Sequence, residues 1–197
     1  MSNSNIGMAI HAMSARYISE FIHEYPMKPA RELWSFSASQ YADSLTSTVC
    51  RIIDCYFQQV TQAWYTERYK KHRPRLFLEY PLRTNRFKPG QPGRADAFML
   101  TDHKCWIWDL KTGAGPSSFD QLAMEALAII YQFRLKDEFP FELTIVQPMA
   151  DQGMNRIRSE RWSAAQIKEA YWGFQDYPVL LEMLGGSAKE RIYMVSE

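Results

Sequence analysis

Residues 93–131 decide the fold that we predict, and they read GRADAFMLTDHKCWIWDLKTGAGPSSFDQLAMEALAIIY. Residues 93–100 form a compact apolar run, and Asp102 with His103 supplies a turn before a second apolar run. A loop rich in glycine and serine then leads to a segment whose apolar residues recur at helical spacing. The stretch therefore predicts a strand, a tight turn, a second strand, a short loop and a helix.

In the second predicted strand, successive side chains point to opposite faces. Cys105 and Ile107 share one face with Asp109 and Lys111, so an acid and a lysine lie side by side at the end of a strand otherwise built to be buried. Asp96 on the first strand reaches the same end if the hairpin pairs in the obvious register. Two carboxylates beside one ammonium are typical of a site for a divalent metal ion and a phosphate.

These residues also resemble the PD-(D/E)XK nuclease superfamily. The similarity lies in G-R-A-D, in D-L-K about a dozen residues later, in the Gln-Leu that begins the next helix, and in the later strand LTIVQP. It covers roughly residues 76–148, with a weaker extension back to about residue 46. Within the superfamily the chain is most similar to RecB-like and phage-encoded exonucleases, of the lambda exonuclease type.

The resemblance implies an α/β protein with a restriction-endonuclease-like core, in which helices flank a central mixed β-sheet. Residues 5–24, and a stripe that runs from residue 41 to about residue 68, carry apolar side chains at helical spacing and predict long N-terminal helices. Residues 75–82 alternate as a strand, and residues 141–147 predict a further buried strand. We expect residues 1–197 to form a single domain, since neither repeats nor a convincing linker interrupt them.

Capping boxes of the pattern S-x-x-Q begin at Ser37 and Ser118, and Ser163 with Gln166 repeats the pattern, so each predicts the start of a helix. The box at Ser118 gives Gln121 a structural role, whereas the resemblance implies that Gln121 orients the substrate. Both roles are compatible, because the first turn of that helix lies close to the loop after Lys111. We expect a short last helix that ends at Gly185 and Gly186, and a terminal strand over residues 191–195.

The resemblance assigns a role to each residue of the predicted site. Asp96 and Asp109 would hold one or two Mg²⁺ or Mn²⁺ ions, and Glu79 matches the glutamate that such nucleases add ahead of the first aspartate. Lys111 would lower the effective pKa of the attacking water or stabilise the developing negative charge, and the sequence leaves both roles open. The catalytic residues that we predict are Asp96, Asp109, Lys111 and Gln121.

Two positions depart from the family pattern. RecB-like nucleases often carry a histidine ligand on the helix before the sheet and an acid four residues later, and here Cys50 and Asp54 stand at those positions. Asp54 is therefore a candidate metal ligand, whereas we expect Cys50 to be a small buried residue, because a thiol binds Mg²⁺ or Mn²⁺ poorly. Glu125 stands where many relatives have a tyrosine.

Basic residues are concentrated in residues 68–75, 83–94 and 156–161, although the net charge of the chain is only +1. Each stretch by itself is also typical of solvated helix ends and loops. Together they flank the predicted site and favour DNA as the partner. The candidate DNA contacts are Arg68, Lys70, Lys71, Arg73, Arg75, Arg86, Lys88 and Arg94.

Several classes of protein do not fit the sequence. The three cysteines fit no zinc or disulfide spacing, and they are too few for the iron–sulfur cluster of some RecB-like relatives. The sequence shows neither a signal-peptide pattern nor the roughly 18 consecutive apolar residues of a membrane span, so we expect a cytoplasmic protein without membrane contact, in the host cytoplasm if it is phage-encoded. Glycine-rich phosphate loops and the G-x-S-x-G motif of serine hydrolases do not occur.

The sequence thus predicts a metal-dependent deoxyribonuclease, with exonuclease action in DNA recombination, repair or replication as the nearest family role. A single-strand annealing or other recombination protein is the partner that such a role implies, and the chain is a candidate homo-oligomer. The main alternative is a catalytically inactive nuclease-fold module that binds DNA or a partner protein. A third reading is a structural α/β protein in which D-L-K occurs by chance.

Overall fold

The computed structural model describes residues 3–25, 47–82, 93–115, 117–149 and 156–172. The helices and strands in these ranges are, in chain order, α1 (Asn3–Glu24), α2 (Ser47–Tyr69), β1 (Arg75–Leu82), β2 (Gly93–Leu100), β3 (Cys105–Leu110), α3 (Asp120–Phe133), β4 (Pro140–Val146), β5 (Ile157–Ser163) and α4 (Ala164–Trp172).

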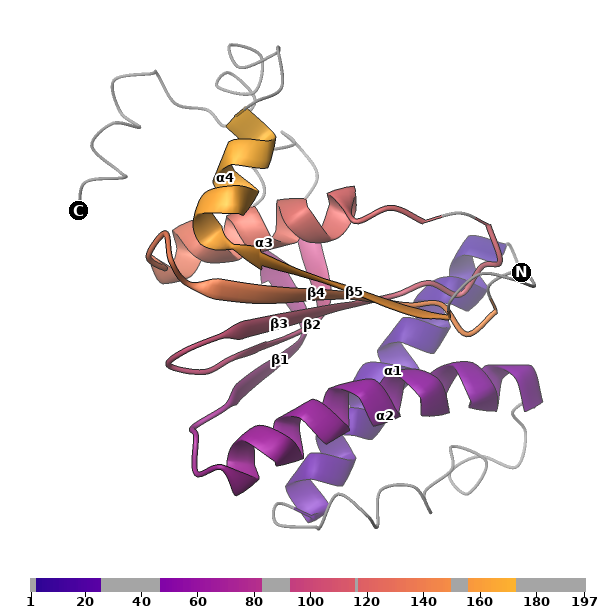
Figure 1. Ribbon diagram of the computed structural model, residues 1–197. Helices are drawn as coiled ribbons and strands as arrows, with labels where there is room; N and C mark the ends of the chain where they lie inside the picture. Colours follow the sequence, from indigo (N-terminus) through magenta and orange to yellow (C-terminus); the bar gives the residue numbers. More distant parts are fainter. Residues whose placement is uncertain (1–2, 26–46, 83–92, 116, 150–155, 173–197) are drawn as a thin grey trace.

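The five strands form one mixed sheet in the order β1-β2-β3-β4-β5. Neighbouring strands are antiparallel except β3 and β4, which are parallel. A parallel pair needs a crossover connection, and the chain between β3 and β4 supplies it with α3. Helices α1 and α2 cover one face of the sheet, and α3 covers the other (Figure 1). The expected α/β architecture, a mixed sheet flanked by helices with long N-terminal helices, is confirmed.

The β2–β3 hairpin has the register that the sequence predicted. Ala97 pairs with Trp108 and Leu100 pairs with Cys105, so the residues between Leu100 and Cys105 make the turn. The Thr101 hydroxyl accepts a hydrogen bond from the backbone N–H of Lys104, which stabilises that turn. This register brings Asp96 and Asp109 to the same end of the hairpin.

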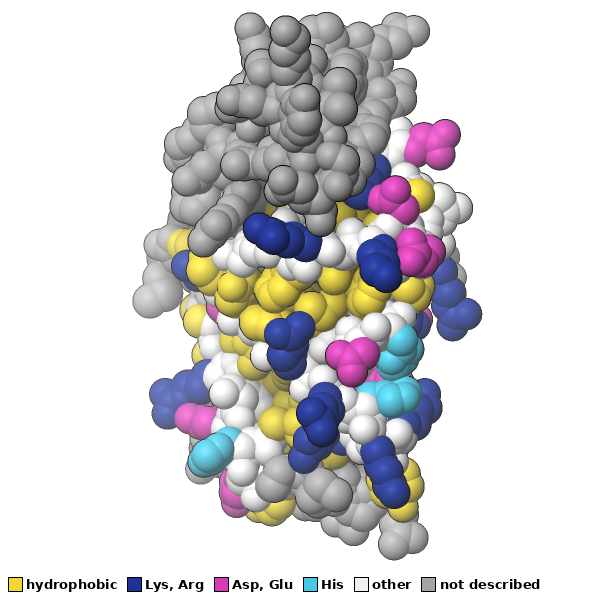
Figure 2. All heavy atoms as spheres, turned by 90° about the vertical axis from the view of Figure 1, so that its left-hand side faces the viewer, with side chains coloured by type: hydrophobic (Ala, Val, Ile, Leu, Met, Phe, Trp, Pro, Cys, Tyr) yellow, Lys and Arg dark blue, Asp and Glu magenta, His cyan; other side chains and the backbone are white. Residues whose placement is uncertain are grey.

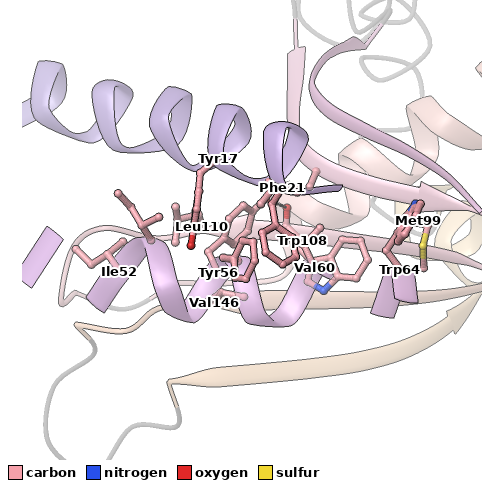
Figure 3. Packing of buried hydrophobic residues seen from close by; sticks show 14 of the residues in the cluster. Tyr17, Phe21, Ile52, Tyr56, Val60, Trp64, Met99, Trp108, Leu110 and Val146 are labelled. Carbon is pink, nitrogen blue, oxygen red and sulfur yellow. Dashed lines mark hydrogen bonds between the residues drawn. The ribbon is translucent and has the colours of Figure 1, made fainter. Parts of the chain in front are cut away.

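One hydrophobic core lies between the sheet and the two N-terminal helices. The β3 side chains Trp108 and Leu110 point into it, where they meet Tyr17 and Phe21 from α1 and Tyr56 from α2 (Figure 3). Burying a large apolar side chain of this kind contributes roughly 1.5–3 kcal/mol. This core therefore fixes α1 and α2 against the sheet.

A second core lies on the opposite face, under α3. Cys105 and Ile107 point into this core, as the alternation of β3 predicted. From α3 it takes the predicted apolar side chains Leu122, Ala126, Ile129 and Ile130, all of which are buried. Because β3 is buried on both faces, the site at its end rests on the most enclosed strand of the sheet.

The C-terminal part confirms one prediction and contains one strand that the sequence did not predict. Ser163 and Gln166 form a reciprocal capping box at the start of α4: the Ser163 N–H donates to Gln166 Oε1 at 2.7 Å, and the Gln166 N–H donates to Ser163 Oγ at 3.2 Å. The sequence did not predict β5, which pairs with β4 along its whole length. The box at Ser37, the last helix and the terminal strand lie outside the described residues.

Three further features of the structure are the surface side chains, the cysteines and the apolar character of the helices. On the side of the molecule that Figure 2 shows, hydrophobic side chains form a band with basic side chains around it. Cys50, Cys55 and Cys105 are free thiols, and Cys50 is buried as expected. Among the described helices, none has the length and apolar character needed to cross a membrane.

Candidate functional site

Asp96 on β2 is held by two hydrogen bonds from other elements. Its Oδ2 accepts the backbone N–H of Leu110 at 2.8 Å, at the point where the β2–β3 ladder has ended. Its Oδ1 lies 2.9 Å from Nδ1 of His11 on α1. An ionised carboxylate can only accept hydrogen bonds, so His11 donates from Nδ1. The carboxylate of Asp96 thus connects α1, β2 and the end of β3.

Asp109 on β3 is a buried carboxylate beside one ammonium group. Nζ of Lys111 donates to its Oδ1 at 3.0 Å and lies 2.9 Å from its Oδ2, which makes no hydrogen bond. Burial, followed by the charge of Asp96, raises the pKa of the Asp109 carboxyl, although Lys111 acts in the opposite direction. Both oxygens of the buried carboxylate therefore face the ammonium of Lys111.

Gln121 and Glu125 extend this network along α3. Nζ of Lys111 donates to Gln121 Oε1 at 2.7 Å, and Gln121 Nε2 donates to Glu125 Oε1 at 3.0 Å. Burial, followed by the negative charges of Asp109 and Asp96, raises the pKa of Glu125 to about 8, against the hydrogen bond from Gln121 and the charge of Lys111. Gln121 thus bridges the Lys111 ammonium and the Glu125 carboxyl group.

The capping box predicted at Ser118 is wrong. Helix α3 begins at Asp120 with Phe119 as its N-cap residue, and no side chain caps it. The Ser118 hydroxyl donates instead to the Asp120 carboxylate at 2.9 Å. The amide of Gln121 is occupied by Lys111 and Glu125, so it does not return to the helix start.

Glu79 on β1 lies beside Asp96 in a strained backbone conformation. The neighbouring pairs Leu78–Ala97 and Tyr80–Ala95 put Glu79 across from Asp96. Its φ of 47° falls in the left-handed region, which costs a non-glycine residue about 1–3 kcal/mol. The Glu79 carboxylate pairs with Arg94 at 3.3 Å.

Three of these side chains form a candidate cation cluster. The donor atoms of His11, Glu79 and Asp96 all lie within 4.8 Å of one another. Asp54, the candidate ligand on α2, is half-buried and is not one of the three. Carboxylate oxygens are the preferred ligands of Mg²⁺ and Mn²⁺. The donor set of His11, Glu79 and Asp96 fits such an ion, whereas Asp109, the other predicted ligand, is not part of this group.

His11 is the residue at the site that the sequence analysis missed. One sequence pattern could have indicated His11. Gly7 and His11 lie one turn apart on the same face of α1, next to the buried Ile10. At Gly7 the helix lies next to the loop after Lys111, where an added Cβ would make an ordinary van der Waals contact with Thr112 Oγ1 at 3.4 Å. His11 lies one turn further along the same helix.

The loop after Lys111 is anchored to β4 and β5. Gln147 Nε2 donates to the carbonyl oxygens of Gly113 at 2.8 Å and Gly115 at 2.6 Å. Arg158 Nη2 donates to the carbonyl oxygen of Ser117 at 2.8 Å. Arg158 thus fixes the loop that borders the site.

The candidate DNA contacts do not form one cluster around this site. Arg94 is connected to the site by its hydrogen bond to the Glu79 carboxylate. Arg75 lies four residues along β1 from Glu79, which is about 13 Å at roughly 3.3 Å per residue. The other described candidates, all exposed, lie at the end of α2 and in the connection to β1: Arg68, Lys70, Lys71 and Arg73. Arg86 and Lys88 lie outside the described residues.

Comparison with known proteins gives a family but no characterised relative. A family model described as "Protein of unknown function (DUF2800)" matches residues 2–170. The matched span includes the whole sheet and every residue of the site described above. No curated protein and no solved structure matches the chain.

Proposed function

The chain belongs to the DUF2800 family, and we propose that it is a divalent-metal-dependent nuclease with a restriction-endonuclease-like core, which hydrolyses phosphodiester bonds in DNA. The observation that carries the proposal is the convergence of Asp96, Asp109 and Lys111 at one end of the β2–β3 hairpin. Buried carboxylates that outnumber the cations beside them attract a divalent ion, and one ammonium next to them suits a phosphate.

The donor set indicates which residues would hold the ion. His11, Glu79 and Asp96 offer donor atoms close together, and Asp109 offers the buried Oδ2 that makes no hydrogen bond. A bound Mg²⁺ or Mn²⁺ ion supplies polarisation of the phosphate and a water of lowered pKa. The protein positions one of these ligands by itself, because Leu110 and His11 hold the Asp96 carboxylate before any ion arrives.

Lys111 is the group that acts on the charge of the phosphate. Its Nζ donates to Asp109 and Gln121, and its side chain is 29 % exposed, so the ammonium is both oriented and accessible. Because the Asp109 carboxylate and Gln121 Oε1 both accept hydrogen bonds, Lys111 Nζ acts as a hydrogen-bond donor at this site. This favours stabilisation of the negative charge on the attacked phosphate over removal of a proton from water.

The sequence resemblance further favours exonucleolytic action in recombination, repair or replication. It also implies a single-strand annealing or other recombination protein as the partner. Among the described basic residues, Arg94, which contacts Glu79, and Arg158, which holds the loop after Lys111, are candidates to meet the DNA backbone next to the site.

The second candidate function is a catalytically inactive module that binds DNA or a partner protein. One observation favours it: Nζ of Lys111 lies within 3.0 Å of both oxygens of Asp109, so the ammonium already neutralises a carboxylate that a metal ion would need. In that case Lys111 replaces the ion and stabilises the fold.

A cleavage assay distinguishes the two functions. The full chain is incubated with linear duplex, circular and single-stranded DNA in Mg²⁺, in Mn²⁺ and in EDTA. We expect cleavage that EDTA abolishes and that Asp109→Asn lowers by several orders of magnitude, while Asp102→Asn, at the opposite end of the hairpin, leaves it unchanged. Cleavage that persists in EDTA or in Asp109→Asn contradicts the nuclease site. Binding of DNA without cleavage of any form supports the inactive module.

A further inference from the structure

A second group of potential metal ligands lies at the other end of the β2–β3 hairpin. Glu67 is in the last turn of α2, His72 is in the connection to β1, and His103 is in the turn between β2 and β3. The Leu100–Cys105 pair flanks that turn, whereas Asp96 contacts Leu110 at the opposite end of β3. The two groups are therefore separate sites.

The three donor atoms converge on one carboxylate oxygen. Glu67 Oε2 lies 2.5 Å from Nδ1 of His72 and 3.5 Å from Nε2 of His103. All three donors lie within 4.8 Å of one another. The Glu67 side chain is 4 % exposed, whereas His72 is 38 % exposed and His103 is 48 % exposed. Figure 2 shows two histidine side chains next to each other at the surface. The carboxylate is thus buried and the imidazoles open to solvent.

The orientation of His103 leaves a lone pair that faces the carboxylate. The Thr101 hydroxyl donates its one proton to the carbonyl oxygen of Lys104 at 3.0 Å, so it accepts from Nδ1 of His103 at 3.2 Å. With the proton on Nδ1, a neutral His103 turns the lone pair of Nε2 toward Glu67 Oε2. A positive charge between Nε2 and Oε2, either a proton or a metal ion, would satisfy both atoms.

The carboxylate of Glu67 is held so that Oε2 stays directed at the histidines. Its other oxygen, Oε1, accepts from Nζ of Lys70 at 3.1 Å. The backbone N–H of His72 donates to the carbonyl oxygen of Glu67 at 3.1 Å, which fixes the turn that carries the imidazole. A second partner that orients each ligand is typical of protein metal sites.

We propose that Glu67, His72 and His103 bind a transition-metal ion of the zinc class, with water in the remaining coordination position. Two imidazole nitrogens and one carboxylate suit Zn²⁺, whereas Mg²⁺ prefers oxygen ligands alone. At metal–ligand distances of about 2.1 Å, tetrahedral donors lie about 3.4 Å apart. Glu67 and His103 already have this spacing, and His72 reaches it by withdrawing about 1 Å, as the ion replaces its proton.

A bound ion at this position ties three segments together. It links the end of α2 to the chain entering β1 and to the β2–β3 turn, where the two imidazole rings already contact each other with centroids 4.3 Å apart. Its role is to stabilise the fold, because ligand binding to the folded state alone raises stability. This inference is independent of the proposed nuclease activity.

The test is a zinc titration of the full, untagged chain, stripped of metal, by calorimetry and thermal unfolding. Zn²⁺ at 100-fold excess over its Kd is expected to raise Tm by roughly 5 °C or more. His103→Ala and Glu67→Gln should each lose one Zn²⁺ equivalent and that rise in Tm. His23→Ala, which removes an exposed histidine of α1, should behave like wild type, and His11→Ala should keep the equivalent that His103→Ala loses.

The comparison of variants decides the assignment. Circular dichroism of each metal-free variant shows that it is folded before the titration. The proposal is overturned if His103→Ala and Glu67→Gln bind as many Zn²⁺ equivalents as wild type, or if Zn²⁺ raises their Tm as much. It is also overturned if wild type binds no Zn²⁺ beyond what His11→Ala removes.

Discussion

The imidazole of His11 and the carboxylate of Asp96 lie 2.9 Å apart, although 85 positions separate the two residues in the chain. The same carboxylate accepts the backbone N–H of Leu110. The N-terminal helix therefore contributes directly to the site at the end of the β2–β3 hairpin. Because the ligands are already held in place before the ion arrives, ion binding costs less conformational entropy.

His11→Ala is expected to weaken Mn²⁺ binding by roughly 10- to 100-fold, because it removes both a donor atom and the group that orients Asp96. Isothermal titration of the purified protein with Mn²⁺ measures the change. His23→Ala, at the exposed end of the same helix, is the matched control and should bind as wild type does. Equal affinity in both variants would remove His11 from the metal site.

The protonation of His11 gives this binding a pH dependence. Burial by itself lowers the pKa of His11, but the hydrogen bond and charge of Asp96, with the charges of Glu79 and Asp109, raise it on balance. An ion that binds at this cluster competes with the proton, so Mn²⁺ affinity should fall as the pH drops through the pKa of His11. In His11→Ala the same titration should show a weaker pH dependence.

Lys111→Ala is expected to destabilise the metal-free protein by roughly 1–3 kcal/mol. The substitution leaves the buried Asp109 carboxylate without its ammonium partner. The loss is smaller than for a fully buried pair, because Lys111 is 29 % exposed and solvent partly screens its charge. Mg²⁺ should restore much of the loss, since the ion supplies the missing positive charge. Urea unfolding in EDTA and in Mg²⁺ measures both effects.

Lys136→Ala is the control for that measurement, because Lys136 is exposed in the turn between α3 and β4. It should change the unfolding free energy by less than about 0.5 kcal/mol in either buffer. If Lys111→Ala behaves like Lys136→Ala, the ammonium does not support Asp109, and the site assignment loses its central contact.

The strands that carry the site were predictable because their patterns are local. β1, β2 and β3 follow from alternating or continuous apolar residues bounded by turns, and the turn at Thr101 sets the hairpin register. That register alone brings Asp96 and Asp109 to one end. The place of Gln121 follows from its position in the first turn of α3, one loop after Lys111.

The parts that were missed depend on contacts between distant segments. The contact of His11 with Asp96 depends on how α1 packs over the sheet, which no local pattern encodes. The one-turn spacing of Cys50 and Asp54 occurs in any helix, so that spacing by itself does not place Asp54 at a metal site. β5 is an edge strand that carries mostly charged and polar side chains, and it pairs only because β4 offers it an open edge.

Replacing Lys71 and Arg73 together by glutamine tests whether the end of α2 meets DNA. Both side chains are exposed there. If each neutralises one phosphate, the slope of log K against log salt should become less steep by about 2, at about 0.9 per phosphate. Fluorescence anisotropy with duplex DNA in EDTA measures the slope, and Arg16→Gln on α1 is the control. An unchanged slope would mean that Lys71 and Arg73 do not contact the DNA phosphates.

Glu125→Gln is expected to stabilise the metal-free protein at alkaline pH. Burial and the charges of Asp109 and Asp96 raise the pKa of Glu125 to about 8 from a usual value of 4.5. The folded state therefore keeps this proton after the unfolded chain has lost it, and stability falls as the pH rises from about 4.5 to about 8.

Glutamine keeps the acceptor for Gln121 Nε2 and carries no charge at any pH, so this part of the pH dependence should disappear. Urea unfolding in EDTA should show the variant more stable than wild type by a few kcal/mol above pH 8, at about 1.4 kcal/mol for each pKa unit, and nearly equal to it at the acidic end. Glu169→Gln, at an exposed position of α4, should leave the pH profile unchanged. A variant as sensitive to alkaline pH as wild type would mean that Glu125 is ionised in the folded protein, with its charge balanced by Lys111 through Gln121.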